Sequence, residues 1–297
     1  EDASYYRVSD CTWSWSVAYG FGGSGQGGTA YAPYGFWVRC VGFNNYQAGL
    51  DLLDHDAYTD VQQSGIIYCT LYRNARYMGS SGGSGSGGSG AASWDGQLYI
   101  DGGHDIFLWG NHVYNAGVQA NANPTNGISI SSEHQSKPTY NIDARRNRVY
   151  DIPGYGISIS KGGDWPALTN GTPTTGNIFY NNTVLRGSSG YGGAFYAAGL
   201  GTSTKTIFKG NILYRTAGNY PLVMWNSAST GMASSTTESD YNLYYDPNKT
   251  KLFSTGDGGA SYTNQTLAEW QSATGLDTNS IQTNPYLIST NFSSQDA

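Results

Sequence analysis

The histidines and acidic residues of this chain are unevenly distributed. Of its 297 residues only 12% are charged, and four are histidines. Three of the four histidines follow an alternating apolar segment and stand among other ionisable residues. The groups are Asp54-His55-Asp56, Asp101-Gly102-Gly103-His104-Asp105 and Glu133-His134, and Lys161, Asp164 and Trp165 follow the next such segment. In so weakly charged a chain, this recurrence predicts one site assembled from several segments.

Two enzymatic chemistries fit these residue types. If the segments lie side by side, like charges raise the pKa of one carboxyl above that of its neighbour, which separates an acid from a base. Asp101 and Glu133, with Asp54 nearby, would then suit a retaining glycoside hydrolase, whose carboxyl groups are about 5 Å apart. His104, His134 and Lys161 would instead transfer protons in a lyase. Tyr99, Trp165 and Asp164 would contact the sugar.

A metal site and a purely structural role use the same residues. His55 and Asp56 are plausible metal ligands, and a divalent cation such as calcium held by carboxylates could neutralise a uronate. The structural alternative is that Asp and His side chains only brace a turn by local hydrogen bonds. The sequence leaves these alternatives open.

The segments that carry these residues belong to a repeat. Short segments such as VRCVGF, LWGNHVYN, ARRNRVYD and KGNILYR align on one column, which recurs at intervals of 29 to 42 residues. The column contains Cys11, Cys40, Cys69, Asn111, Asn147, Asn182, Asn211 and Asn242. Each of these residues is followed by an alternating apolar pattern, which is typical of a strand.

A second column identifies the architecture. Leu98, Ile128 and Ile157 align in the segments GQLYIDG, GISISSE and GISISKG, and the residues between the apolar positions must face the other way. Short strands repeating once per coil and stacked about 4.8 Å apart form a parallel β-helix. The sequence therefore predicts an all-β fold, a single right-handed parallel β-helix of about eight coils.

The Asn column predicts a hydrogen-bonded ladder, because an Asn at a turn can bond to the turn backbone and to the Asn of the next coil. In the first three coils Cys takes the same position, where a small apolar side chain fits. We expect three buried thiols; one disulfide between adjacent coils is geometrically possible.

The ends and insertions suggest two regions. Residues 1–245 carry the coils, with a flexible Gly/Ser insertion at 79–90. Residues 246–297 form a C-terminal capping segment, in which Thr266 and Glu269 predict a capping box that opens a short helix closed by Gly275. No equivalent cap is seen at the N-terminus, which suggests head-to-tail self-association through an open coil edge.

Composition excludes some partners. The formal charge is −6 without a cluster of Lys or Arg, so nucleic acid is not expected as a partner. No apolar run is long enough to span a membrane. The chain begins at Glu1 and not at Met, which suggests a processed mature chain or an excised piece, and we expect a secreted, extracellular or cell-surface protein.

Two stretches resemble a known group of proteins. The coil sequence GISISSEHQSKPTYNIDARRNRVYDIPGYGISIS and the ending SDYNLYYDPN…TLAEWQSATGLDTNSIQTNPYL are similar to secreted bacterial right-handed β-helix repeat proteins of the pectate-lyase-like superfamily. The resemblance covers residues 95–297 well and the earlier coils loosely. It implies the fold, and it spans polysaccharide lyases, glycoside hydrolases, epimerases and adhesins. The Asn-Thr-Asp, Asp-Asp, Gly-His-Gly and Arg-Ile-Lys motifs of polygalacturonases and the acidic calcium motif of pectate lyases are missing.

Two classes of function follow. The first is an extracellular, carbohydrate-directed protein that cleaves a polysaccharide as a glycoside hydrolase or polysaccharide lyase. The second is a non-catalytic protein, either a fibre-forming surface component or a carbohydrate-binding adhesin.

Overall fold

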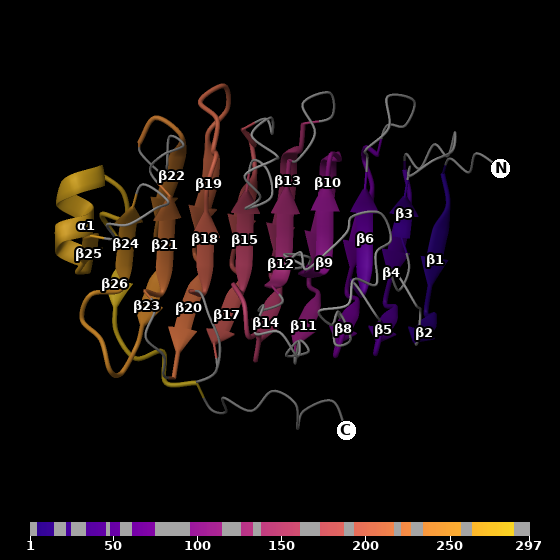
Figure 1. The fold of residues 1–297 in the computed structure, drawn as a ribbon, viewed down its shortest axis with the longest axis horizontal. Coiled ribbons are helices and arrows are strands. Elements are labelled where there is room, and N and C mark those ends of the chain that lie inside the picture. Colours follow the sequence, from indigo (N-terminus) through magenta and orange to yellow (C-terminus); the bar gives the residue numbers. More distant parts are fainter. Residues whose placement is uncertain are drawn as a thin grey trace, which may run out of the picture.

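The protein is a parallel β-helix (Figure 1). The computed structural model describes residues 5–14, 22–24, 34–45, 48–53, 61–74, 96–114, 126–132, 138–160, 173–186, 193–216, 221–226, 234–256 and 263–287. In these ranges the strands form three sheets, and each sheet receives one strand from each successive turn of the chain. The all-β parallel architecture and the short C-terminal helix predicted from the sequence are thereby confirmed.

The strands of the three sheets follow one another in the chain. Sheet A contains β1 (Arg7–Ser9), β4 (Phe36–Val38), β7 (Gly65–Ile67), β10 (His104–Trp109), β13 (Tyr140–Arg145), β16 (Ile178–Tyr180), β19 (Thr206–Lys209) and β22 (Thr237–Asp240). Sheet B contains β2 (Thr12–Ser14), β5 (Val41–Phe43), β8 (Thr70–Tyr72), β11 (His112–Tyr114), β14 (Arg148–Tyr150), β17 (Thr183–Arg186), β20 (Ile212–Arg215), β23 (Leu243–Tyr245) and β26 (Ile281–Gln282).

Sheet C closes each coil. It contains β3 (Gly22–Ser24), β6 (Leu50–Leu53), β9 (Gly96–Asp101), β12 (Asn126–Ser131), β15 (Ile157–Ser160), β18 (Phe195–Ala197), β21 (Val223–Asn226), β24 (Phe253–Gly256) and β25 (Thr263–Gln265). Among the described strands every pairing is parallel except that of β24 with β25. Sheets B and C thus both continue past Tyr245, through β26 and β24.

The core lies inside the coils, between the three sheets. In sheet C the inward column runs from Leu98 through Ile128 and Ile157 to Phe195, in register from strand to strand. The residues that alternate with them, such as Ser129 and Ser158, pair with each other on the outer face. Inward apolar residues stacked in register bury their surface against the coils above and below, which stabilises the solenoid.

The corner between sheets A and B has the same two-residue form in every described coil. Its first residue always has a positive φ. Some of these residues are not glycine, as Arg146 (56°), Asn181 (55°) and Tyr241 (57°) show, and others are, such as Gly210 (67°). The second residue is the Cys or Asn of the repeat column. One residue in the left-handed conformation bends the chain sharply, so the strand of sheet B can follow that of sheet A without a loop.

The Asn column forms the predicted ladder along this corner. The Oδ1 of Asn182 accepts hydrogen bonds from the backbone N–H of Asn147 at 3.0 Å and from its Nδ2 at 2.9 Å. The Nδ2 of Asn182 donates to the Oδ1 of Asn211 at 3.0 Å and to the carbonyl of Ala144 at 3.0 Å. The same pattern joins Asn111 to Asn147 and Asn211 to Asn242. Each side-chain amide therefore satisfies backbone groups that the corner leaves without strand partners.

Cysteine occupies the ladder position in the first coils. The backbone N–H of Cys69 donates to Asn111 Oδ1 at 2.9 Å, and the backbone N–H of Cys40 contacts the Sγ of Cys69 at 3.4 Å. All three thiols are free, with Cys40 and Cys69 buried but Cys11 exposed. The prediction of three buried thiols is wrong for Cys11, whose corner belongs to the first described coil.

The ladder ends on a carboxylate at the C-terminal end. The Nδ2 of Asn242 donates to Asp277 Oδ1 at 3.0 Å, and its backbone N–H donates to Ser280 Oγ at 2.9 Å. Asp277 is buried and also accepts from Tyr244 Oη and Trp270 Nε1, both at 3.0 Å. The Trp270 ring belongs to α1 (Leu267–Thr274), which begins with the predicted Thr266–Glu269 capping box and ends at Gly275.

The outer face of sheet B carries a stack of aromatic rings. Phe43, Tyr72, Tyr114 and Tyr150 occupy one register column, and successive ring centroids are 5.1, 5.1 and 4.8 Å apart with nearly parallel planes. Tyr214 and Tyr245 continue the column further along. These rings pack on one another from coil to coil.

Replacing one ladder amide should destabilise the whole solenoid. Asn182→Ala removes the acceptor of the backbone N–H and Nδ2 of Asn147 and the side-chain donor to the carbonyl of Ala144, all of them buried. Asn211 Oδ1 keeps only the backbone N–H of residue 182. We expect the free energy of unfolding to fall by about 3 kcal/mol in urea titrations. Thr183→Ala, on the neighbouring residue outside the ladder, is the matched control. Equal stability of the two variants would contradict the assigned role of the ladder.

The three cysteines should differ in reactivity. Burial raises the pKa of the Cys69 thiol to about 12, so Cys69 stays a protonated and shielded thiol at pH 8. Cys40 is shielded as well. We expect Ellman's reagent to titrate one thiol rapidly in the folded protein, namely Cys11, and all three in denaturant. Cys11→Ser should abolish the rapid phase, and a second rapid thiol would contradict the burial of Cys40 and Cys69.

Candidate functional site

The predicted site residues follow strands of sheet C or stand within them. The connections from sheet C to sheet A hold most of them: residues 54–64 join β6 to β7, 132–139 join β12 to β13, and 161–177 join β15 to β16. Asp54, His55, Asp56, Glu133, His134, Lys161, Asp164 and Trp165 lie outside the described residues. The structure describes Tyr99, Asp101 and His104, which surround the shortest connection, 102–103.

Tyr99 and Asp101 lie on the outer face of sheet C and are buried. Both alternate with the inward Leu98 and Ile100, and Asp101 pairs in register with Ser131 of the next coil. Asp101 has no solvent exposure and Tyr99 has 6%. In this arrangement neither side chain presents an open surface to a ligand.

His104 forms a hydrogen-bonded pair with Asp105, beside the turn. The Nδ1 of His104 lies 2.7 Å from Asp105 Oδ2, and Asp105 Oδ1 accepts from Asn141 Nδ2 at 3.0 Å. The His104 ring stacks on Tyr140 with centroids 4.5 Å apart and planes 4° apart. The His104 side chain retains 17% exposure. An imidazole held on both its face and its Nδ1 has a fixed orientation.

The local sequence explains how this pair forms. Gly102 has a φ of 83°, and a Cβ at Gly103 would lie 2.6 Å from Ile106 Cδ1, so two glycines allow the chain to pass from β9 to β10. Asp105 (52°), Asn141 (54°) and Gly176 (66°) then form a column of left-handed residues at the start of sheet A. Asp and Asn tolerate this conformation, and stacking the coils brings their side chains together.

Serine side chains form pairs along the outer side of sheet C. Ser129 Oγ and Ser158 Oγ are 3.0 Å apart, and Ser131 Oγ and Ser160 Oγ are 3.3 Å apart. On the next coil Tyr196 stacks on Tyr155, with centroids 4.5 Å apart. The outer side of sheet C therefore carries paired hydroxyls between two tyrosines, Tyr99 and Tyr196, and Ser129, Ser158 and both tyrosines are buried.

The sequence identified His104 but not its partners. Asp105 stood beside His104 in the sequence, yet its role depends on Asn141, which is 36 residues away. Aligning GHD at 103–105 with TYN at 139–141 would have placed these residues on one column. Within the described ranges, no group of three or more His, Cys, Asp or Glu side chains is arranged to hold a metal ion.

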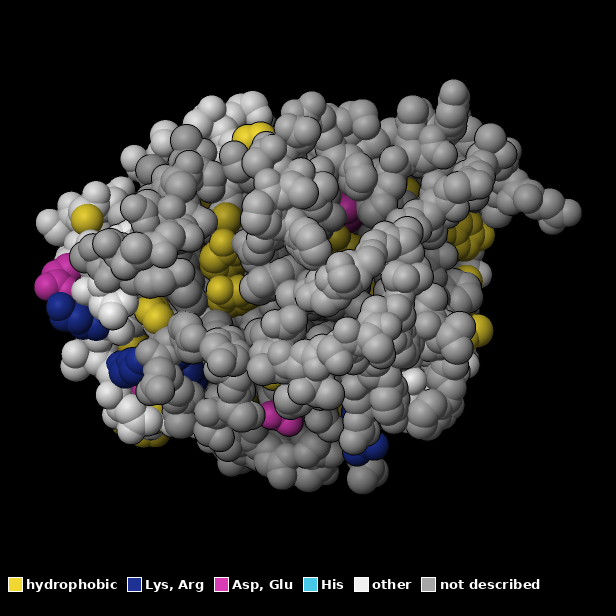
Figure 2. All heavy atoms as spheres, in the orientation of Figure 1, with side chains coloured by type: hydrophobic (Ala, Val, Ile, Leu, Met, Phe, Trp, Pro, Cys, Tyr) yellow, Lys and Arg dark blue, Asp and Glu magenta, His cyan; other side chains and the backbone are white. Residues whose placement is uncertain are grey.

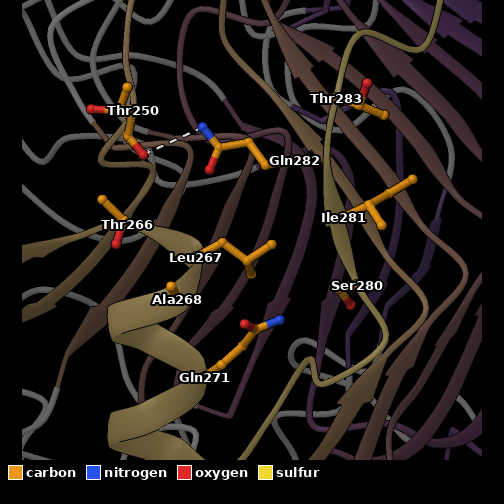
Figure 3. Close-up of a pocket in the computed structure, with 9 residues that line it drawn as sticks. All are labelled: Thr250, Thr266, Leu267, Ala268, Gln271, Ser280, Ile281, Gln282 and Thr283. Atoms are coloured by element: carbon orange, nitrogen blue, oxygen red, sulfur yellow. Dashed lines mark hydrogen bonds between the residues drawn. The ribbon is translucent and has the colours of Figure 1, made fainter.

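A separate pocket lies at the C-terminal end, between α1 and β26 (Figure 3). Its volume is about 710 Å³, and it is open to solvent. The pocket is lined by Thr250, Thr266, Leu267, Ala268, Gln271, Ser280, Ile281, Gln282 and Thr283. Gln282 Nε2 donates to the carbonyl of Thr250 at 3.3 Å across it. None of the lining side chains ionises near neutral pH, so the pocket has no acid or base for catalysis.

The described surface is weakly charged. In the view of Figure 2, the few charged side chains that are coloured lie mostly toward the edges of the molecule, and hydrophobic side chains are visible between them. No helix within the described ranges is long and apolar enough to cross a lipid bilayer.

Comparisons with known proteins give limited similarity. No family model matches the chain. The uncharacterized protein YwoF of Bacillus subtilis (strain 168) is 31% identical over 150 residues, which cover 50% of this chain and 28% of that protein. Among solved structures, the A-module of the Azotobacter vinelandii mannuronan C-5 epimerase AlgE6 matches with a TM-score of 0.47 and 11% identity. That match covers 94% of this chain and 58% of the epimerase module.

The hydrogen bond to Asp105 should fix the tautomer of His104. An ionised carboxylate only accepts, so Nδ1 carries the hydrogen and Nε2 is left as the acceptor. We expect ¹⁵N correlation spectra of the neutral ring to show a protonated Nδ1 in the wild type. Asp105→Ala should restore the Nε2–H form that is usual for free imidazoles, whereas Asp143→Ala, on the same strand pair, should leave the spectrum unchanged. A wild-type ring protonated on Nε2 would exclude the pair.

Proposed function

We propose that this chain is an extracellular, carbohydrate-directed protein that holds a polysaccharide at the corner between sheets C and A, where His104 transfers a proton. The observation that carries the proposal is the pair of His104 and Asp105, braced by Asn141 and Tyr140. The pair lies beside the connection from sheet C to sheet A. The other ionisable residues of the repeat occur in the equivalent connections of the neighbouring coils.

Carbohydrate is the ligand class that best fits the side chains available. Sugar hydroxyls both donate and accept hydrogen bonds, and sugar rings stack on aromatic faces. The partly exposed groups at this corner are the His104 imidazole, the Tyr140 ring and the Ser160 hydroxyl, with few fixed charges beside them. A polymer is favoured over a small molecule because ionisable residues recur at this position of successive repeats in the sequence.

Proton transfer fits the described geometry better than nucleophilic attack by a carboxylate. Asp101 has no solvent exposure, whereas the His104 ring is partly exposed and its Nε2 is the acceptor when Asp105 holds Nδ1–H. In a lyase, Nε2 would take the proton next to a sugar carboxyl group, and the electron pair released would expel the oxygen of the glycosidic bond, which leaves with a proton from an acid. Glu133, His134 and Lys161 are the candidates for that acid, and a carboxylate-bound calcium ion would neutralise the uronate.

A hydrolase remains the second enzymatic form of the proposal, with Asp101 and Glu133 as its carboxyl pair. The non-catalytic alternative is a fibre-forming protein or adhesin, assembled head to tail through the N-terminal coil edge. At the C-terminal end, the antiparallel strand β25 is the last strand of sheet C, and α1 follows it. This arrangement does not favour the stacking of another coil on that end.

The function is tested by screening purified protein on neutral and uronic-acid polysaccharides, reading both new reducing ends and the absorbance of unsaturated products. If His104 transfers the proton, His104→Ala should lower turnover by at least about 100-fold. His112→Ala, on the outer face of sheet B, is the control and should retain full turnover. Unsaturated products would indicate a lyase, and new reducing ends without them a hydrolase.

Two outcomes would overturn the proposal. Full activity in His104→Ala would remove the residue from the chemistry. No turnover and no binding on any polysaccharide, with filaments visible by electron microscopy, would favour the fibre-forming alternative.

A further inference from the structure

The outer face of sheet A has an aromatic and aliphatic strip over three neighbouring strands. Phe36 and Val38 stand on β4, Ile67 on β7, and Phe107 and Trp109 on β10, in two register columns. We define these five residues as the platform. Phe107 and Trp109 lie edge to face, with centroids 5.1 Å apart. Trp109 is 37% exposed and the others are partly exposed.

Glycines keep the rings flat against the sheet. A Cβ at Gly65 would lie 2.8 Å from the Phe36 ring, so that ring occupies the position over the glycine. At the adjoining corner, a Cβ at Gly110 would lie 2.5 Å from the ring of Tyr68, which is 62% exposed. Each of the two rings therefore lies over a glycine of the neighbouring coil. A planar ligand that approaches the strip meets no side chain at these glycines.

We infer that the platform is a second carbohydrate-binding surface, which takes the C–H face of neutral sugar rings in a polysaccharide running along the helix axis. The inference shares with the proposed function only the assignment of a carbohydrate as ligand, because the platform contains neither His104 nor the residues that contact it, Asp105 and Tyr140.

Charge is the first reason to assign a neutral sugar. All five side chains of the platform are uncharged. Of the charged groups that border it, Arg7 is exposed in register with Phe36 on β1, and two ion pairs stand beside the strip. Arg145 Nε contacts Asp143 Oδ1 at 2.5 Å on one border, and Arg39 makes two hydrogen bonds to Asp10 on the other. Sugar hydroxyls can donate to the carboxylate and accept from the guanidinium of such a pair without separating it. The five platform side chains themselves offer no countercharge to a charged ligand.

Size is the second reason. Three strands about 4.8 Å apart, with two outward side chains each, present roughly 150 Å². A stable protein interface needs about 800 Å² on each partner. The platform is therefore too small for a second protein or a second copy of this chain, and its elongated shape across successive coils suits one polymer chain.

The test is retention of the folded protein on neutral polysaccharides, by depletion on cellulose and chitin and by affinity electrophoresis in xylan and galactomannan, with alginate as the charged comparison. We expect binding to at least one neutral polysaccharide that high salt does not weaken. Trp109→Ala should reduce the affinity about tenfold without lowering the melting temperature. Tyr241→Ala, an exposed tyrosine at the same corner beside β22, should bind like the wild type.

Three results would overturn the inference: equal affinity of Trp109→Ala and the wild type, retention only on alginate with loss in high salt, or no retention on any polysaccharide. A dimer in light scattering that becomes a monomer in Trp109→Ala would assign the platform to self-association and would also overturn it. The His104→Ala variant separates the two proposals. Loss of turnover in His104→Ala with normal retention of Trp109→Ala would leave the proposed function standing and reject the platform.

Discussion

The Asn ladder is the interaction on which the rest of the structure depends. A polypeptide that turns a sharp corner once in every coil leaves backbone groups without strand partners, and burial makes each such group costly. From Asn111 onward, one side-chain amide per coil satisfies these groups and connects each coil to the next. Because the Oδ1 of each Asn accepts from the coil before it and its Nδ2 donates to the coil after it, the ladder has a direction. It therefore requires an acceptor at its C-terminal end, and Asp277 supplies that acceptor.

Much of the fold could be predicted because the constraint is local and repeated. The ladder residues, the inward column of Leu98, Ile128 and Ile157, and the capping box at Thr266 all leave periodic or short-range patterns in the sequence. What could not be predicted depends on contacts between coils at single positions. The exposure of Cys11 follows from its place in the first described coil, and the convergence of five donors on Asp277 joins segments far apart in the chain.

In the candidate site, too, the sequence predicted residue types, whereas contacts between coils determine their geometry. The sequence identified His104 as a member of a polar cluster, and residue type alone suggested proton transfer. Its orientation depends on Asp105 and Asn141, which meet only because adjacent coils place two left-handed residues side by side. The burial of Asp101 could not be foreseen either, because the alternation of sheet C assigns its side chain to the outer face without saying how that face is covered.

The fixed form of the corner between sheets A and B bears on how such a chain can change over generations. Two residues make this corner in every described coil, whereas the connections from sheet C to sheet A range from 102–103 to 161–177, and those from sheet B to sheet C extend to 73–95 between β8 and β9. Differences in coil length are therefore taken up on either side of sheet C and spare the ladder. Loop exchange at those two corners would alter what the protein recognises while the scaffold keeps its stability, so recognition and folding can be selected almost independently in this architecture.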